Sequence, residues 1–155
     1  MNHKLKAILA GGLIGGAVDI SYAIGFSWIR SNGQVTPARV LQSVASGLLG
    51  PSAFNGGVPV AILGCGLHFA MALVIATIYV YAARTLTDLI RRPVFYGAIY
   101  GLVVYSVMNA LVVPLSLVPA RTAPRPTILI ISELLVHMIG VGVTIALAAR
   151  RYSRS

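Results

Sequence analysis

Residues 127–149 read TILIISELLVHMIGVGVTIALAA. This stretch is long enough to cross the hydrocarbon core of a bilayer as one α-helix, which takes about 20 residues. It does not alternate between polar and apolar residues, as a strand of a membrane barrel does. Its two ionisable residues, Glu133 and His137, stand four positions apart and therefore share one face of the predicted helix. The stretch predicts a membrane-spanning helix with one polar face.

Three further stretches have the same character. The four predicted spans cover residues 6–29, 58–83, 93–118 and 127–149. Hydrophobic residues make up 57% of the 155 residues and charged residues only 10%. Soluble domains carry about 25% charged residues, so this composition argues against an ordinary soluble domain. We expect an all-α membrane protein, a single domain over residues 1–155 with four transmembrane helices in an up-down bundle.

The first span begins like a secretory signal peptide, with basic residues, an apolar run and a loose cleavage site at Ser21–Ala23. However, Asp19 interrupts the apolar run, and apolar residues continue as far as Ile29. We therefore expect the first span to be retained.

The distribution of Lys and Arg predicts the orientation in the membrane. The chain has 12 Lys and Arg residues against three Asp and Glu, a net charge of +9. With the N-terminus inside, the inner side holds Lys4, Lys6, Arg84, Arg91, Arg92, Arg150, Arg151 and Arg154. The outer side holds Arg30, Arg39, Arg121 and Arg125. The excess places both termini in the cytoplasm. Because these charges flank apolar runs, they indicate contact with the lipid bilayer and no nucleic-acid partner.

A short helix is predicted over residues 36–50, in the first outer loop. Thr36 followed by Pro37 is a typical helix start. The apolar residues of this segment then fall on one face, namely Val40, Leu41, Val44 and Leu48. The pattern predicts an interfacial amphipathic helix, which is either a lid over the bundle or a plain connector.

Small residues recur at helical spacing within the spans. They are Gly11, Gly12, Gly15, Gly16, Gly97, Gly101, Gly140 and Gly142. In lipid, small residues drive helix association because they allow close van der Waals contact. They indicate either packing within one bundle or a seam with a second copy or another membrane subunit.

Several polar side chains lie within the predicted spans, where a charge costs about 2.5–3.5 kcal/mol. In an up-down bundle Asp19, His68, Asn109 and His137 each lie nine or ten residues from the outer helix end, about 13–15 Å deep. This depth is close to the bilayer midplane. Tyrosines share the same helix faces, so one cluster is predicted from Asp19, Tyr22, His68, Tyr105, Asn109, Glu133 and His137.

Pro114 is expected to bend the third span just above this cluster. It has no N–H to donate to the carbonyl of Ala110. A carbonyl freed in this way inside a membrane must face protein or a water-filled cavity.

The cluster is open to several interpretations. It either binds a small ligand, an ion or a proton, or it is a structural hydrogen-bond network with no ligand. Haem or a metal held by His68 and His137, with Glu133 as a third metal ligand, is an alternative. The sequence has no recognisable catalytic motif, and its one cysteine, Cys65, has no partner for a disulfide. We therefore expect a non-enzymatic protein, although catalysis stays open.

Residues 66–151 resemble the YagU-like family of small bacterial inner-membrane proteins. The resemblance is carried by His68, Tyr79, Tyr96-Gly97 through Asn109, Pro114-Leu115, Ser132-Glu133-x-x-x-His137 and Arg150-Arg151. The N-terminal part, with Asp19, departs from the family pattern. The resemblance implies a bacterial inner-membrane location and four spans, and it carries no activity. With the polar residues, it leads us to expect a multi-pass protein that binds a small ligand, ion or proton or acts as an accessory or oligomeric subunit.

Overall fold

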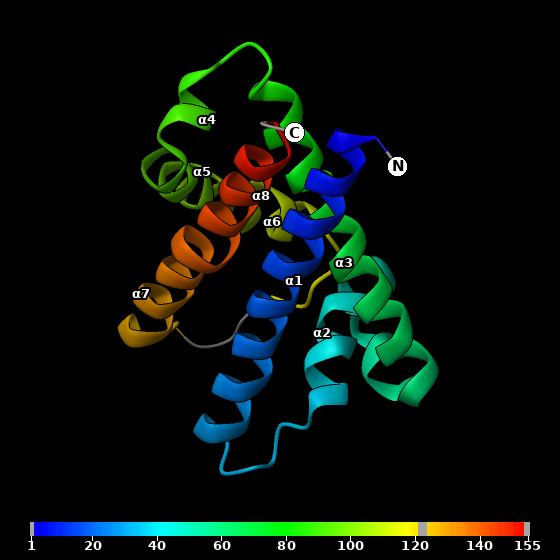
Figure 1. The fold of residues 1–155 in the computed structure, drawn as a ribbon. Coiled ribbons are helices and arrows are strands. Elements are labelled where there is room, and N and C mark those ends of the chain that lie inside the picture. Colours follow the sequence, from blue (N-terminus) through cyan, green and yellow to red (C-terminus); the bar gives the residue numbers. More distant parts are fainter. Residues whose placement is uncertain (1, 121–123, 154–155) are drawn as a thin grey trace.

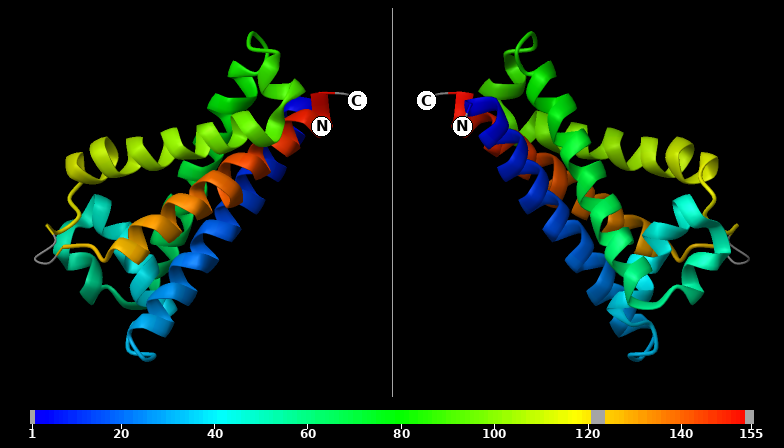
Figure 2. Two further views of the ribbon diagram at one scale, coloured as in Figure 1. Left: turned by 90° about the vertical axis from the view of Figure 1, so that its left-hand side faces the viewer. Right: turned by 90° about the vertical axis from the view of Figure 1, so that its right-hand side faces the viewer.

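The computed structural model describes residues 2–120 and 124–153, and every regular element in these ranges is helical. Two basic residues used above to predict orientation, Arg121 and Arg154, lie outside the described residues. Four long helical segments are connected by short elements (Figure 1). The start of the first long segment and the end of the last lie at the same end of the molecule (Figure 2).

The first two long segments are single helices, α1 (His3–Arg30) and α3 (Gly57–Ala82). Each of the other two is interrupted by a π-helical stretch. The third consists of α5 (Pro93–Val107), η2 (Met108–Val112) and α6 (Val113–Leu115). The fourth consists of α7 (Thr127–Leu135), η3 (Val136–Val143) and α8 (Thr144–Ser153). Short elements link them, namely α2 (Pro37–Leu49), η1 (Gly50–Asn55) and α4 (Asp88–Arg91).

All four long segments are long and apolar enough to cross a membrane. They begin and end within a few residues of the spans read from the sequence. Many large apolar side chains on them are exposed, for example Ile62 (68%) and Ile139 (63%). So much exposed apolar surface is unfavourable in water but is stable in contact with lipid. These features are those of a multi-pass membrane protein.

Local sequence explains where several helices begin. The Asn2 side chain accepts a hydrogen bond from the backbone N–H of Lys4 at 3.1 Å and caps α1. The Thr36 hydroxyl accepts from the N–H of Arg39 at 3.3 Å, directly before Pro37. Such caps satisfy backbone donors that have no partner within the helix.

Glycines bring α1 close to two neighbours at once. A Cβ added to Gly11 would lie 3.1 Å from the Cα of Ile145 in α8. On the adjacent face, a Cβ added to Gly12 would lie 3.1 Å from the Cα of Leu73 in α3. Consecutive glycines therefore serve two different interfaces within the chain, and α1 lies between α3 and α8 (Figure 1).

The third long segment packs mainly on η3, again through glycines. A Cβ added to Gly97 would lie 2.8 Å from the Cα of Val143, and one added to Gly101 would lie 2.5 Å from the Cα of Met138. Small residues thus set how closely the third and fourth segments approach. Figure 2 shows the third segment inclined to the other long helices.

Helix α2 is held against the rest of the protein. Gly64 of α3 lies directly against the backbone of Leu41, and the Gln42 side chain donates to the carbonyl of Gly57 at 2.9 Å. On its other side, the carbonyl of Gly47 accepts from the N–H of Leu117 at 3.0 Å. The face expected to be apolar is only partly the buried one. Gln42 and Ser46 are buried, whereas Leu48 is 58% exposed. Close backbone packing on α3, which sequence periodicity does not encode, selects that face.

The helix changes character before Pro114, at the place where the sequence predicted a bend. The π-helical stretch η2 lies immediately before the short helix that contains Pro114. A proline removes one backbone donor, so the chain before it must adopt another hydrogen-bond register. Helical structure ends at Leu115, three residues earlier than expected.

Candidate functional site

A partly open cavity of about 610 Å³, which we call the interior cavity, lies between α2 and the long helical segments. Its lining includes the side chains of Asp19, His68 and His137, from three different long segments. The rest is mostly apolar, with side chains such as Met71 and Val104, apart from serines that include Ser46. Small-molecule sites usually enclose about 300–1,000 Å³ and combine apolar walls with a few polar groups.

Asp19 and His137 lie next to each other in the lining of this cavity. The Oδ1 atom of Asp19 lies 3.6 Å from Nδ1 of His137, and the two side chains are 23% and 17% exposed. Nδ1 of His137 also lies 2.9 Å from the carbonyl oxygen of Glu133, to which it donates a hydrogen bond. The edge of the Tyr105 ring contacts the imidazole, with centroids 5.5 Å apart. His137 is therefore fixed by three different neighbours.

The helical register around His137 is irregular. His137 lies in the π-helical stretch η3, where backbone hydrogen bonds reach one residue further than in an α-helix. The changed register accompanies the bond from its imidazole to the carbonyl of Glu133, one turn earlier. Short π-helical stretches inside α-helices often mark functional sites.

His68 is held by the backbone of α1. Its Nε2 atom donates to the carbonyl oxygen of Gly16 at 2.8 Å. Gly16 has no side chain, and a Cβ there would lie 3.0 Å from the Cβ of Ala72 and 3.2 Å from the ring of Phe69. Gly16 precedes Asp19 by three residues, which places His68 within one helical turn of the level of Asp19.

Glu133 and Asn109 are held by an arginine from the preceding loop. The guanidinium of Arg125 forms an ion pair with the carboxylate of Glu133 and donates from Nη1 to Oδ1 of Asn109 at 2.7 Å. The amide of Asn109 donates in turn to the carbonyl of Tyr105 at 2.9 Å. The side chains of Arg125 and Glu133 are only 18% and 25% exposed, so this ion pair is largely buried.

Tyr22 belongs to a separate contact. Its hydroxyl shares a hydrogen bond with that of Ser132, at 2.5 Å. The Ser132 hydroxyl also lies 2.6 Å from the carbonyl of Ile128, in its own helix. This contact joins α1 to α7.

The seven predicted residues are thus divided among connected groups. Asp19, His68 and His137 line the cavity, and Tyr105 contacts His137. Asn109, Glu133 and Tyr22 are instead engaged by Arg125 and Ser132, which were not among the seven. Asn109 lies six residues before the end of its helix, where nine were expected, because helical structure ends at Leu115.

The sequence contained some sign of these two residues. Arg125 stands two positions before an apolar span, and a long side chain there reaches one or two turns along the helix. Ser132 directly precedes Glu133, on the turn that faces α1. Both signals are weak, because an arginine next to a span is ordinarily attributed to membrane orientation.

His68, His137 and Glu133, the metal ligands suggested by the sequence, do not form a group that could hold an ion. No group of three or more His, Cys, Asp or Glu side chains suited to a metal ion occurs among residues 2–120 and 124–153. Glu133, the proposed third ligand beside His68 and His137, is engaged by Arg125. The lone cysteine, Cys65, is half-buried and free.

Comparisons with known proteins give no family for this chain. No family model, no curated protein and no solved structure matches it. The resemblance to the YagU-like family therefore stays a prediction.

Proposed function

We propose that this membrane protein binds a small amphiphilic molecule in the interior cavity. The observation that carries the proposal is one mostly apolar cavity of about 610 Å³ that receives Asp19, His68 and His137 from three separate segments. An apolar body fits the walls of such a cavity, and a polar group finds a carboxylate and two imidazoles. The proposal is one of binding and not of catalysis.

The electrostatics favour a buried polar partner at this position. Nδ1 of His137 donates to the carbonyl of Glu133 and lies 3.6 Å from Asp19, beyond an ordinary hydrogen bond. The Asp19 carboxylate and Nε2 of His137 therefore retain capacity for a further partner. Ionisable side chains inside a membrane are expensive and usually mark a ligand or ion pathway. The same proposal includes a single ion or proton as the ligand, bound between Asp19 and His137.

In this proposal the four long segments cross the membrane up and down, with both chain ends at the cytoplasmic face. The basic residues near those ends support this orientation. The resemblance to the YagU-like family adds the inner membrane of a bacterium. Helix α2 then lies at the outer face and covers the cavity, because Ser43, Val44 and Leu48 line it.

Cysteine labelling tests this orientation. In a Cys65→Ser background, Thr87→Cys and Gln34→Cys each place one exposed thiol in a different connecting segment. A membrane-impermeant maleimide applied to intact cells should label the cysteine at position 34 and not the one at 87. Labelling of both, or of position 87 alone, contradicts the orientation.

Three ten-carbon probes test ligand binding, namely decylamine, decanol and decanoate. The purified chain, reconstituted in lipid nanodiscs, is melted with each probe. We expect at least one probe to raise the melting temperature of the wild type and not of Val44→Trp, which fills the cavity. Ile62→Trp, on an outward position that is 68% exposed, is the matched control and should respond like the wild type. Equal responses of all three proteins to every probe would refute the proposal.

An absorption spectrum separates this proposal from the haem alternative. A Soret band in the purified protein that disappears in both His68→Ala and His137→Ala would assign these histidines to haem and replace the proposed amphiphile. A spectrum without that band leaves the probe experiment to decide.

A further inference from the structure

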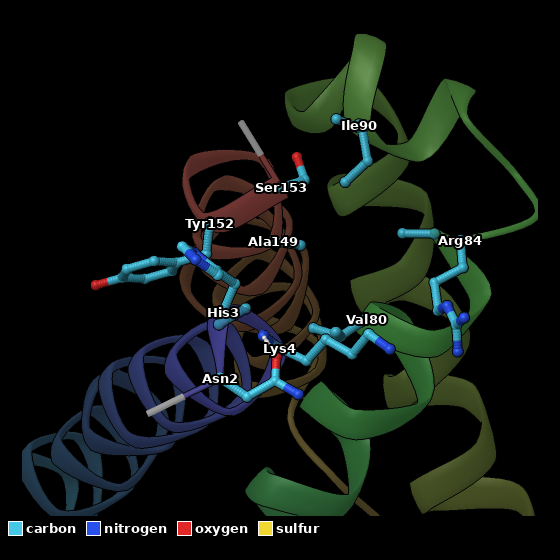
Figure 3. A pocket seen from close by; sticks show the side chains of 11 residues that line it. Asn2, His3, Lys4, Val80, Arg84, Ile90, Ala149, Tyr152 and Ser153 are labelled. Carbon is cyan, nitrogen blue, oxygen red and sulfur yellow. Dashed lines mark hydrogen bonds between the residues drawn. The ribbon is translucent and has the colours of Figure 1, made fainter. Parts of the chain in front are cut away.

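A second hollow lies at the end of the molecule remote from α2. Its volume is about 270 Å³, and it is formed by the start of α1, the end of α3, the segment around α4 and the end of α8 (Figure 3). We call it the terminal pocket. It shares no lining residue with the interior cavity, so it is a separate site.

The terminal pocket has apolar walls and a polar rim. Its walls include Ala7, Val80 and Ala149, which belong to the buried core of this end of the bundle. The polar residues that line it are Asn2, His3, Lys4, Arg84 and Ser153. Walls that belong to a packed core keep their shape without a ligand, so the pocket is preformed.

Two cations of the rim lie close to the same aromatic ring. The Nζ atom of Lys4 and the Cζ atom of Arg84 each lie 5.9 Å from the centroid of the Tyr81 ring. Figure 3 shows the Lys4 side chain extending toward the helix end that carries Arg84. One cation at the start of α1 and one in the turn after α3 therefore both line this pocket and both lie near the same ring.

The positive charge of this rim is not balanced by carboxylates of the described residues. The salt bridges within residues 2–120 and 124–153 join Asp88 to Arg91, Glu133 to Arg125 and Asp19 to His137. The chain has no other Asp or Glu, and its net charge is +9. None of these three carboxylates is paired with Lys4 or Arg84 in the described part of the chain, so the two cations can receive an external anion.

The pocket also lies at the level expected of lipid headgroups. The candidate span His3–Arg30 begins there, and the spans Gly57–Ala82 and Thr127–Ser153 end there. The ends of membrane spans mark the boundary between hydrocarbon and headgroups. A phospholipid places its phosphate at this boundary and its acyl chains beside the apolar walls.

We propose that the terminal pocket binds the phosphate group of an anionic phospholipid, with Lys4 and Arg84 on the phosphate. Inorganic phosphate shares the oxyanion chemistry, but it leaves the apolar walls uncovered. A lipid uses both features of the pocket. The site is independent of whatever the interior cavity binds.

Native mass spectrometry of the full chain in detergent tests the site directly. Phosphatidylglycerol and phosphatidylcholine with identical acyl chains are titrated, and the dissociation constant of the first bound lipid is measured for each. We expect phosphatidylglycerol to bind at least about fivefold more tightly. A basic residue near an anionic surface contributes about fivefold in affinity, so Lys4→Gln with Arg84→Gln should weaken phosphatidylglycerol binding about 25-fold.

A matched double variant tests whether the pocket matters or only the total charge. Lys6→Gln with Arg92→Gln removes two charges from the same end of the protein, outside the pocket lining. It should weaken binding less than twofold. The charge-preserving pair Lys4→Arg with Arg84→Lys should keep the preference and shows that a loss is not due to misfolding. Equal losses in the two Gln pairs, or no preference in the wild type, overturn the proposal.

Competition distinguishes the two sources of phosphate. Sodium phosphate replaces sodium chloride at constant ionic strength during the phosphatidylglycerol titration. The proposal predicts less than a twofold effect. Displacement of the lipid by millimolar phosphate would assign the pocket to a free phosphate and overturn the lipid proposal.

Discussion

Gly101→Ala tests the close approach that positions His137. The added methyl would lie 2.5 Å from the Cα of Met138, and the carbonyl of His137 is nearer still. Carbon atoms in favourable contact are about 3.5–4.0 Å apart, so the third and fourth segments must separate by about 1 Å. Backbone cannot move aside as a flexible side chain can. We expect a loss of about 1–3 kcal/mol in the free energy of unfolding, the usual cost of overpacking.

The assay compares this variant with Gly66→Ala by reversible unfolding in mixed micelles. Gly66 also lies within a long helix, but a Cβ there meets nothing within 4 Å. Alanine favours a helix over glycine by up to about 1 kcal/mol, so Gly66→Ala should be neutral or stabilising. If Gly101→Ala proves as stable as Gly66→Ala, the argument that glycines set the distance between these segments is refuted.

Two other contacts give expected outcomes in the same unfolding assay. Glu133→Gln should destabilise the protein by about 1–2 kcal/mol, because the largely buried Arg125 guanidinium loses its carboxylate partner and keeps its bond to Asn109. The double variant with Arg125→Gln should lose less stability than the sum of the two single variants. Strictly additive losses would mean that the two side chains do not interact. Tyr22→Phe should lower the free energy of unfolding by about 0.5–1 kcal/mol, because it removes the hydrogen bond to Ser132. In a Ser132→Ala background the same change should have no further effect. An equal loss in both backgrounds would mean that the Tyr22 hydroxyl does not bind Ser132.

Much of the fold could be predicted because it depends on local composition. Twenty or more apolar residues in a row require a helix of membrane length, and proline and cap residues mark its ends. The contact between Asp19 and His137 could also be predicted, because buried ionisable groups must find polar partners and helical faces can be read from residue spacing. These arguments need no knowledge of how the segments pack.

The sequence could not predict what depends on packing at atomic distance. The buried face of α2 is decided where the backbone of Leu41 meets Gly64, and it coincides only in part with the apolar face predicted from periodicity. The π-helical register around His137 was not predicted from the sequence either. Arg125 was assigned to a loop, although its side chain extends into the bundle as far as Glu133. Long side chains carry charge over distances that sequence position does not reveal.

A double-mutant cycle between Asp19 and His137 tests most directly whether polar groups from separate spans meet inside the protein. The variants Asp19→Asn, His137→Gln and their combination are unfolded under identical conditions. Polar contacts between membrane helices contribute about 0.6–1.7 kcal/mol, so we expect a coupling energy in that range. Asp19→Asn with Thr77→Val is the control cycle, because the Thr77 hydroxyl donates to the carbonyl of Leu73 in its own helix and should not couple. A coupling energy indistinguishable from that control would contradict a shared interior site.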